Sequence, residues 1–510
     1  MLNLSLSEQS SYFPVIISLT LLSLSFILLL KWSSSFTTNN SDRPPSPPTF
    51  PIIGNLHQLG LYPHRSLAKL AEIHGPIMLL HLGSVPALII SSADMAREIM
   101  KTHDLIFSDR AKTRLTQILL YGRKDVAAAP YGEYWRQMKS ICVLHLLSNK
   151  RVQSYRDIRE EETDLVVDRI KNTCSSPLNL SEILAKLTND ITCRIALGRK
   201  YSGTKKGRSF KDLLTEFAEL LGFFDVGDFI PWLGWVSSVK GLYGKAKKIA
   251  KEMDEFFDSV VDEHVENGNW KVESSSKDFV DVLLWIQKEN MAGFAIDRTA
   301  IKAIILDVFS AGTDTTYVLL EWVMIELLRH PEAMKKLQSE IREIAENKSE
   351  ITEDDLQKIP YLKAVIKETL RLHPPIPLLV PRVATQDVKI KGFHIAAGTR
   401  VIINAYLIGR DPTLWDRAEE FLPGRFLNSG IDYKGQNFEL IPFGSGRRIC
   451  PGVQFAISND ELALAKLLHS FDWKLHGVPT IQDLDMTEST GLTIHRKFPL
   501  YVVATPYSAF

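Results

Sequence analysis

The stretch over residues 443–452, which reads FGSGRRICPG, constrains this chain more than any other. Its glycines allow left-handed backbone conformations and let the main chain come close to a flat partner. Two arginines beside Cys450, and a helix predicted just downstream over residues 455–468, both favour the thiolate form of the cysteine. A thiolate in a tight loop that faces a planar anionic group is what an axial haem ligand requires. A glycine-rich turn with an inert buried cysteine fits the same residues, so this stretch alone leaves both interpretations open.

Length, charge and cysteine usage exclude several classes of protein. The chain has 510 residues, enough for a large core. Lys+Arg and Asp+Glu balance at 60 each, which leaves no global charge for binding nucleic acid. The cysteines lie far apart, without a CxxC pair or zinc-type spacing: Cys142, Cys174, Cys193 and Cys450. A disulfide scaffold is therefore not expected, and a reducing compartment that faces the cytosol fits better.

The N-terminus carries a candidate transmembrane anchor over residues 13–32. Residues 13–30 contain no charge and are long enough to span a bilayer. Positive charge begins only at Lys31, so the positive-inside rule puts residues 1–12 in the lumen and the body in the cytosol. A cleaved signal peptide is the alternative, although no basic segment precedes the apolar run and no small-residue cleavage site follows it.

Residues 33–50 are predicted to form a linker and a proline-rich hinge. The hinge reads PPSPP at residues 44–48, and prolines favour a stiff, extended backbone. This composition indicates a semi-rigid strut between the membrane and the body. A ligand for a proline-binding domain is the alternative.

Residues 51–510 are predicted to form one large domain of the mainly α (α+β) class. Apolar periodicity predicts helices over residues 93–101, 131–145, 158–171, 180–195, 210–221, 239–266, 279–288, 299–330, 331–346, 354–371 and 455–468. Strands are predicted over residues 77–82, 87–91, 388–390, 394–395 and 401–404, and near 493–504. Without repeats or a break in composition, we expect a helix-rich body with small β-sheets near both ends.

The long helix predicted over residues 299–330 carries the sequence AGTDTT at residues 311–316. Gly312 costs a helix about 1 kcal/mol relative to alanine, so its presence calls for a function. Ala311 and Gly312 let a flat body pack close, and threonine hydroxyls that bond to the preceding turn make room for water or dioxygen. Asp314 and Thr315 supply an acid and an alcohol, the parts of a proton relay. A kinked core helix with a solvated aspartate is the alternative.

Two further groups of residues combine charge with a defined spacing. Glu368 and Arg371 stand at i, i+3 on one helical face, and Arg425 in the stretch PGRF completes a three-member ion network. Trp135 and Lys139 place an indole N–H and an ammonium one turn apart, a pair suited to a carboxylate. Surface ion pairs and an interfacial tryptophan beside an extended lysine stem are the respective alternatives.

In this order and at these separations, the segments resemble a cytochrome P450, a haem-thiolate monooxygenase. The likeness is to the plant microsomal A-type, which oxidises specialised metabolites, and it covers nearly the whole chain. Its specific part is the signature Phe-x-x-Gly-x-Arg-x-Cys-x-Gly, which is complete at Phe443, Gly446, Arg448, Cys450 and Gly452. The resemblance implies the cytochrome P450 fold behind one N-terminal transmembrane helix, with haem b (iron protoporphyrin IX) bound by a catalytic domain over residues 51–510.

The resemblance also implies roles for individual residues. Cys450 is the axial iron ligand, and its thiolate favours O–O cleavage. Asp314 and Thr315 deliver protons to dioxygen, and Glu368, Arg371 and Arg425 form a structural ion triad. The remaining cofactor-binding residues belong to the cysteine loop or face the haem propionates: Phe443, Gly446, Arg448, Arg382, Trp135 and Lys139. The substrate-facing residues are apolar: Leu119, Phe223, Phe224, Ile305, Val308, Phe309, Leu378, Leu379 and Leu492.

Three positions depart from the family pattern. Lys139 stands where an arginine is usual, and a lysine cannot bind a propionate through two parallel hydrogen bonds. Gly424 replaces a usual glutamate, and Ser46 replaces a hinge glycine. None of these changes affects the cysteine, the acid or the alcohol, so we expect an active enzyme.

The function implied is an NADPH- and dioxygen-dependent monooxygenase at the endoplasmic reticulum membrane, single-pass, with its catalytic domain in the cytosol. The sequence has no GxGxxG dinucleotide fingerprint, so electrons are expected from a separate NADPH–cytochrome reductase, with cytochrome b5 as a further candidate. The expected reaction is hydroxylation, epoxidation, or oxidative desaturation or ring closure of an alkaloid, terpenoid or coumarin. The alternatives are a reductase-independent haem-thiolate isomerase or dehydratase, and a membrane-tethered haem-binding sensor.

Overall fold

The computed structural model describes residues 16–20, 22–23, 42–173, 176–201, 210–271, 277–290, 296–345, 348 and 350–507. Residues 1–12, the linker over 33–41 and most of the predicted anchor over 13–32 lie outside the described residues. The described pieces of the anchor segment are helical, and their apolar side chains Ile16, Leu19 and Leu22 are exposed. The membrane topology of the N-terminus stays a prediction.

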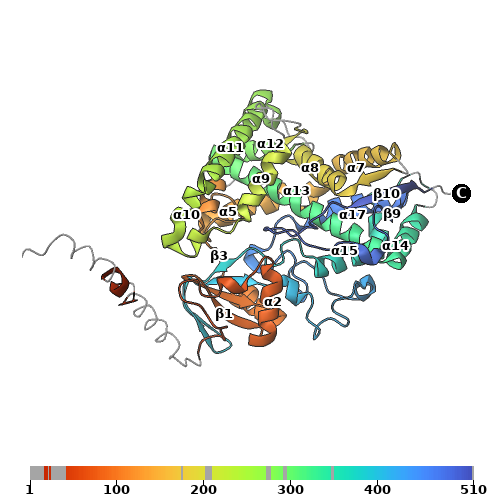
Figure 1. The fold of residues 1–510 in the computed structure, drawn as a ribbon. Helices are drawn as coiled ribbons and strands as arrows, with labels where there is room; N and C mark the ends of the chain where they lie inside the picture. The colour runs from red at the N-terminus through yellow and green to blue at the C-terminus, as the bar shows by residue number, and fades with distance from the viewer. Residues whose placement is uncertain are drawn as a thin grey trace, which may run out of the picture.

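Helix α13 (Arg298–Arg329) runs through the centre of a helix-rich body (Figure 1). It begins at Asp297, whose side chain accepts a 2.7 Å hydrogen bond from the Ala300 N–H, as a helix N-cap does. Helices α8 (Leu180–Leu197) and α17 (Val453–Ser470) pack along it. The other α-helices of the described residues are α2 (Pro63–His74), α3 (Ala93–Arg97), α4 (Arg114–Leu119), α5 (Glu133–Ile141), α6 (Asn149–Ser154), α7 (Arg156–Lys171), α9 (Phe210–Leu221), α10 (Gly234–Val239), α11 (Leu242–Asn267), α12 (Phe279–Lys288), α14 (Pro331–Ile344), α15 (Pro360–Leu372) and α16 (Ala405–Ile408).

The largest sheet has the strand order β1-β2-β8-β5-β3. An antiparallel hairpin of β1 (Ile77–Leu82) and β2 (Val85–Ile90) pairs in parallel with β8 (Arg400–Ile403). Strand β5 (Arg382–Val383) then joins β8 to β3 (Asp109–Arg110), and Arg110 is the cross-strand partner of Arg382. The smaller sheets are β4-β10-β9, from Pro177–Asn179, Tyr501–Pro506 and Phe471–Leu475, and β6-β7, from Val388–Ile390 and Phe393–Ile395. Arg110 and Arg382 therefore lie side by side in the largest sheet.

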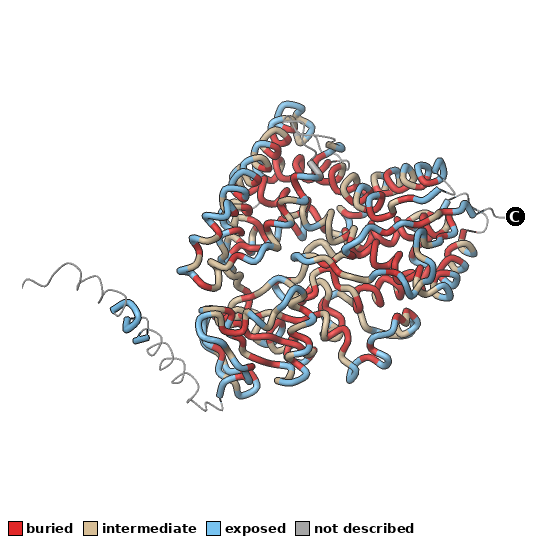
Figure 2. The backbone as a smooth tube through the Cα atoms, in the orientation of Figure 1, coloured by how far each residue is buried: buried red, intermediate tan, exposed pale blue. Residues whose placement is uncertain are grey.

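Buried side chains form a large core in the helical body and smaller ones around the sheet. Figure 2 shows the buried backbone concentrated inside the helical body, with exposed residues along its outer edges. Trp322 and Phe309 of α13 are among the largest fully buried side chains. Leu88 and Val401, from neighbouring strands of the sheet, belong to a second cluster. The five-stranded sheet thus has hydrophobic clusters of its own, whereas strands β9 and β10 pack in the main core.

Element boundaries differ from the sequence prediction where the backbone turns. The helix predicted over residues 239–266 is divided between α10 and α11, because Gly241 adopts a left-handed φ of 74°. The helix predicted over 354–371 begins only at Pro360, a residue that is well placed in the first turn but disrupts a helix interior. The C-terminal strand covers Tyr501–Pro506 rather than beginning near residue 493. Short elements such as α2 and β9 carried no strong periodic signal and were missed.

One helix of the described residues, α13, is long and apolar enough to match a membrane span in length and composition. It is also the central helix of the body, and half of its most apolar window is buried there. Core helices of soluble proteins have the same composition, so we assign α13 to the core.

Candidate active site

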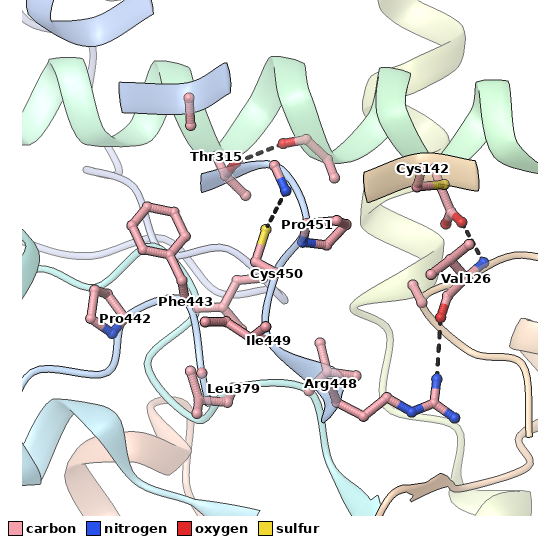
Figure 3. A pocket seen from close by; sticks show the side chains of 18 of the residues that line it. Val126, Cys142, Thr315, Leu379, Pro442, Phe443, Arg448, Ile449, Cys450 and Pro451 are labelled. Carbon is pink, nitrogen blue, oxygen red and sulfur yellow. Dashed lines mark hydrogen bonds between the residues drawn. The ribbon is translucent and has the colours of Figure 1, made fainter. Parts of the chain in front are cut away.

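The sequence motifs meet at one cavity of about 270 Å³ between α13 and the cysteine loop, residues 443–452. The α13 wall is formed by Val308, Ala311, Gly312 and Thr315, which recur at helical spacing on one face. The opposite wall contains Phe443 and Cys450 with their neighbours. Figure 3 shows the Cys450 sulfur below the helix that carries Thr315, with Arg448 at one end of the cavity.

Backbone contacts hold the cysteine loop in a single shape. The Cys450 N–H donates a 3.0 Å hydrogen bond to the Phe443 carbonyl, and the Gly452 N–H donates to the Cys450 sulfur at 3.4 Å. Gly446 has a φ of 70°, and a Cβ there would lie 2.1 Å from the Met100 carbonyl oxygen. Only glycine fits that position, which explains its place in the motif.

The electrostatic setting of Cys450 differs from the sequence expectation. Burial raises the pKa of the thiol, and the Gly452 N–H and the nearby Lys139 charge only partly oppose it. Arg448 contributes little because its guanidinium donates to the carbonyls of Ser108 and Ala129, at 2.7 Å each. Neither flanking arginine is among the groups that oppose this rise, so their predicted effect on the thiolate stays a prediction. A metal ion deprotonates a thiol that it binds, so a bound iron supplies the missing activation.

A second thiol, Cys142, lines the same cavity. It lies where α5 passes into a π-type turn over Cys142–Leu146, and its side chain is buried. Burial also raises the pKa of this thiol. Nothing in the sequence around Cys142 indicated that it shares a cavity with Cys450.

Four cationic side chains line one end of the cavity: Arg110, Lys139, Arg382 and Arg448. Burial, opposed by the charge of Asp109 and assisted by that of Arg382, lowers the pKa of Arg448 to about 10. Burial, followed by the charge of Arg448, lowers the pKa of Lys139 to about 8. Burial lowers the pKa of Arg110 as well, again with both neighbouring arginines adding to the effect. Like charges crowded at a dry cavity favour an anionic occupant.

Several side chains that the sequence analysis assigned to the haem propionates donate hydrogen bonds to backbone carbonyls instead. The Trp135 indole N–H donates to the Val126 carbonyl at 3.0 Å, so it is engaged within the protein. Lys139 donates to the carbonyls of Arg447 and Ile449 and lies 5.3 Å from the centroid of the Trp135 ring. Arg382 donates to Ser445 at 2.7 Å and pairs with Asp104 at 3.0 Å. These side chains therefore also tie the cysteine loop to the rest of the fold.

These residues fit a haem. A haem carries two carboxylates, which match the cationic side chains, and a flat apolar ring, which matches the apolar part of the lining. Cys450 would hold the iron, and Arg110, Lys139, Arg382 and Arg448 would neutralise the carboxylates. When bound, the haem supplies dioxygen activation and electron transfer. Arg110 was not among the residues that the sequence analysis assigned to the cofactor.

The predicted acid and alcohol have different surroundings. Thr315 lines the cavity and its hydroxyl donates a 2.6 Å hydrogen bond to the Ala311 carbonyl, which leaves the oxygen free to accept another. Asp314 is not among the residues that line the cavity, and its carboxylate accepts a 2.5 Å hydrogen bond from the Thr493 hydroxyl. At Gly312 a Cβ would lie 3.2 Å from the Phe455 ring, so the small residue makes room for a close neighbour.

The sequence analysis missed two carboxyl groups where α13 meets the loop over residues 125–128. Asp307 lines the cavity and accepts a 2.5 Å hydrogen bond from the Val126 N–H. Asp125 accepts from the Ala128 N–H at 2.7 Å. Burial raises the pKa of Asp307 well above its usual range, with the Asp125 charge adding to the shift, and burial raises the pKa of Asp125 to about 6. Asp307 therefore contributes to the cavity wall a carboxyl group whose protonated form is favoured by its surroundings.

The three charged residues Glu368, Arg371 and Arg425 are brought together away from the cavity. Arg371 donates to both oxygens of Glu368, at 2.7 and 2.8 Å, and Arg425 donates to one of them at 3.1 Å. Arg371 also binds the carbonyls of Gly409 and Ala418 at 2.6 Å each. The network thus joins α15 to the segment over residues 409–425. Nothing lies within 4 Å of a Cβ at Gly424, so the unusual glycine leaves the network intact.

The predicted substrate residues occupy several parts of the molecule. Val308 and Leu379 line the cavity. Ile305 and Phe309 are fully buried in the main core and do not line the cavity. Leu378 packs against the sheet core, and Leu119 lines a separate, more polar cavity with Tyr121 and Lys302. The remaining three are exposed: Phe223, Phe224 and Leu492.

Comparisons with known proteins agree with this geometry. The model of the family Cytochrome P450 matches residues 44–500. Cytochrome P450 736A117 of Prunus mume is 58% identical over 508 residues, which cover 98% of both chains. Cytochrome P450 71A25 of Arabidopsis thaliana is 52% identical, over 94% of this chain and 99% of that one. Norfluorocurarine oxidase of Strychnos sp is 51% identical, over 96% and 98%. A structure of zebra fish cytochrome P450 with progesterone superimposes with a TM-score of 0.74 at 24% identity, over 88% of this chain and 100% of that one.

Proposed function

The chain belongs to the cytochrome P450 family and is therefore a haem-containing oxidoreductase of the monooxygenase class. On that premise we propose that it oxidises a hydrophobic plant specialised metabolite with dioxygen and with electrons from NADPH, supplied by a separate reductase. The observation that carries the proposal is the single cavity with Cys450 on one wall and Thr315 on the other.

The chain's own residues fit a reaction that needs protons in a dry site. The Thr315 hydroxyl lies in the cavity and has acceptor capacity left after its hydrogen bond to Ala311. It is the group that would pass a proton to the reacting oxygen, with Asp314 behind it as the acid. Apolar side chains around it limit access of other water and so limit unproductive proton delivery. An isomerase that uses neither protons nor electrons would not need this alcohol.

The cavity chemistry supports a neutral apolar substrate. Many of the residues that line the cavity are apolar, among them Val308, Ile376 and Leu379. Burial raises the pKa of Asp307, an acid in the lining, and so favours its uncharged form. An alkaloid, terpenoid or coumarin skeleton fits this lining, and hydroxylation, epoxidation, desaturation and ring closure are all within reach. The relative named norfluorocurarine oxidase suggests that this sequence group serves specialised metabolism.

We further propose that the protein is anchored at the endoplasmic reticulum with its body in the cytosol. An exposed apolar face of the body supports a membrane-bound position. It is built from three segments in contact: the Gly83 N–H donates to the Ile53 carbonyl at 3.1 Å, and the Ser84 N–H donates to the Phe229 carbonyl at 2.8 Å. The exposed side chains on and beside these segments are Phe50, Ile52, Phe223, Phe224, Trp232, Trp235 and Val239.

Tryptophan and phenylalanine in such a cluster favour the interface between water and lipid. Helix α10, which carries Trp235 and Val239, lies at an outer edge of the body in Figure 1. Protease treatment of intact microsomes tests the topology. A C-terminal tag should be digested while an N-terminal tag stays protected; protection of both tags would contradict the cytosolic assignment.

Carbon monoxide difference spectroscopy of the reduced haem protein tests the axial ligand. We expect the red-shifted Soret band of a thiolate-ligated haem, lost in Cys450→Ala. Cys142→Ala is the matched control, because this second cavity thiol should leave the band unchanged. Retention of the band in Cys450→Ala, or its loss in Cys142→Ala, would contradict the ligand assignment.

Reconstitution with an NADPH-dependent reductase tests the reaction. A plant extract should contain compounds that shift the iron spin state, and the products should carry one added oxygen or show loss of two hydrogens. Product formation without NADPH would favour the isomerase or dehydratase. Absence of any spin-state shift and of any turnover across such extracts would favour a haem-binding sensor.

A further inference from the structure

A buried cluster outside the cavity combines one imidazole with two carboxylates: His264, Asp278 and Asp281. One nitrogen or oxygen atom from each residue lies within 4.8 Å of the others. His264 is in the last turn of α11, Asp278 caps α12, and Asp281 is in the first turn of α12. All three residues are buried, with exposed fractions of 5–8%. The proposed monooxygenase reaction uses none of them.

The hydrogen bonds of His264 leave one ring nitrogen facing the carboxylates. Its Nδ1 lies 2.7 Å from the Val260 carbonyl oxygen, which can only accept, so Nδ1 carries a proton. Its Nε2 lies 2.9 Å from Oδ2 of Asp278. A histidine that donates from one nitrogen to a backbone carbonyl and presents the other is arranged as metal-binding histidines are.

An ion pair between His264 and Asp278 would not explain the state of the Asp281 carboxylate. Its Oδ1 is buried and has no hydrogen-bond partner among the described residues. The Asp281 N–H donates to Oδ1 of Asp278 at 2.9 Å, which accounts for the other Asp278 oxygen. An orphaned carboxylate oxygen in a dry site is costly unless a cation or a donor binds it.

The lysine that precedes Asp278 makes its hydrogen bond elsewhere. Lys277 is buried beside the cluster, but its ammonium donates to the Trp270 carbonyl at 2.9 Å and lies 5.5 Å from the centroid of the Trp285 ring. On the opposite side the cluster meets backbone. A Cβ at Gly198 would lie 2.4 Å from Oδ2 of Asp278 and 3.5 Å from Nε2 of His264. The C-terminal end of α8 therefore closes the site without offering a side chain.

We propose that His264, Asp278 and Asp281 bind one zinc ion that joins the end of α11 to the start of α12. Tetrahedral zinc accepts imidazole nitrogen and carboxylate oxygen at about 2.0–2.2 Å, which places its ligand atoms roughly 3.3 Å apart. The 2.9 Å contact between His264 and Asp278 needs to open only slightly, and Asp281 supplies the third ligand. Water fills the fourth position. Calcium and magnesium prefer all-oxygen sites, and the imidazole selects against them.

Charge balance supports a divalent ion. Zinc replaces the proton that His264 and Asp278 share, the imidazole becomes neutral, and two carboxylates balance the charge of the ion. The role is structural: the ion would join helices that lie away from the cavity.

Zinc binding to the haem-loaded full chain, with any affinity tag removed and the protein treated with a chelator, tests the proposal. Equilibrium dialysis followed by elemental analysis should find one zinc per chain, with no comparable binding of calcium or magnesium. Saturating zinc should raise Tm by roughly 2 °C or more, and the chelator should reverse the shift. Absence of saturable binding would overturn the proposal.

Asp281→Asn is the sharpest variant because it replaces the oxygen that lacks a partner, and His264→Gln provides a second test. Both should weaken zinc binding by at least about tenfold and abolish the Tm shift. Glu263→Gln is the matched control: Glu263 neighbours His264 but pairs with Arg199 at 2.9 Å, so zinc binding should be unchanged. Equal zinc binding by all three variants would indicate adventitious surface binding and overturn the proposal. The carbon monoxide spectrum of each variant verifies its fold.

Discussion

The Thr493 hydroxyl donates a 2.5 Å hydrogen bond to Oδ2 of Asp314. Asp314 adjoins Thr315 in α13, yet only Thr315 lines the cavity. A residue of the C-terminal segment therefore determines where the predicted acid is held. Asp314 can reach the cavity only by exchanging this bond for another, which makes Thr493 a positioning residue for the acid.

Asp314→Asn should lower the turnover number by roughly 100-fold, because a positioned general acid contributes at least that much. Thr493→Val should lower the turnover number only a few-fold, because the Asp314 carboxylate remains and loses only its hydrogen bond to Thr493. Turnover with saturating reductase, together with hydrogen peroxide released per NADPH, measures both effects. Asp314→Asn with more than half of the original turnover would contradict the relay.

Thr315→Ala should uncouple electron use from oxidation. Its hydroxyl lies in the cavity, so its loss should reduce product per NADPH several-fold while the carbon monoxide spectrum stays intact. Thr316→Val is the matched control: Thr316 is 1% exposed, does not line the cavity, and its hydroxyl lacks a partner among the described residues. Equal coupling in the two variants would contradict the role of Thr315.

Arg371→Met should destabilise the fold more than Arg425→Met. Arg371 is 1% exposed, and its removal leaves Glu368 and two carbonyls buried without their partner, at a cost of about 3–5 kcal/mol. Arg425 is more exposed and makes a single 3.1 Å contact with Glu368, so its loss costs less. Urea unfolding and haem content per protein measure which of the two variants loses more stability.

Gly424→Glu serves as the control for that network. A Cβ at Gly424 has open space around it, so we expect a change in unfolding free energy within about 0.5 kcal/mol. A large loss of stability in Gly424→Glu, or equal losses in the two arginine variants, would contradict the assigned contacts.

Gly446→Ala should abolish stable haem binding. A Cβ at this position meets the Met100 carbonyl oxygen at 2.1 Å, so the cysteine loop has to move. Gly398→Ala separates this clash from backbone strain, because Gly398 has a φ of 81° but open space around it. The control should cost only about 1–2 kcal/mol and keep its haem. Haem content per protein after purification checks both, and full haem content in Gly446→Ala would be the contrary result.

Glu461→Gln should stabilise the protein at alkaline pH. Burial raises the pKa of Glu461 to about 7, with Glu353 adding to the shift and Lys363 opposing it. The folded state therefore binds the proton more tightly than the unfolded state, whose glutamates titrate near 4.3, and stability falls as pH rises from about 4.5 to about 7. The variant should match the native protein at pH 4.5 and exceed its unfolding free energy by about 2 kcal/mol at pH 8. Identical pH profiles in urea unfolding would contradict this.

Local patterns in the sequence were sufficient for the parts of the site that depend on short spacings. The glycines around Cys450 identify a tight loop because few residues tolerate left-handed φ, and Gly446 adopts it. Glu368 and Arg371 share a helical face by spacing alone, and the structure pairs them. The α13 face with Gly312 and Thr315 follows from the helical period and lines the cavity.

The orientation of side chains could not be inferred in this way. The sequence predicted that the Trp135 indole N–H binds a carboxylate, but in the fold it donates to the Val126 carbonyl. Phe309 is apolar and close to Gly312 in sequence, yet it turns into the core. Residues Phe223 and Phe224 lie on an exposed face instead of in the cavity. Such outcomes depend on which distant segment packs against each face.

The family, the helix-rich fold and the identity of the cysteine loop follow from residue types at short, fixed spacings, and the chain alone was enough to recognise them. Which residues meet depends on contacts between distant segments, which the fold creates. It placed a second thiol, Cys142, in the cavity of Cys450, brought Arg110 beside Arg382, and turned Asp314 toward Thr493. It also assembled His264, Asp278 and Asp281 from two helices. Burial and long-range contact set the protonation and direction of these groups, and neither property is encoded in local spacing.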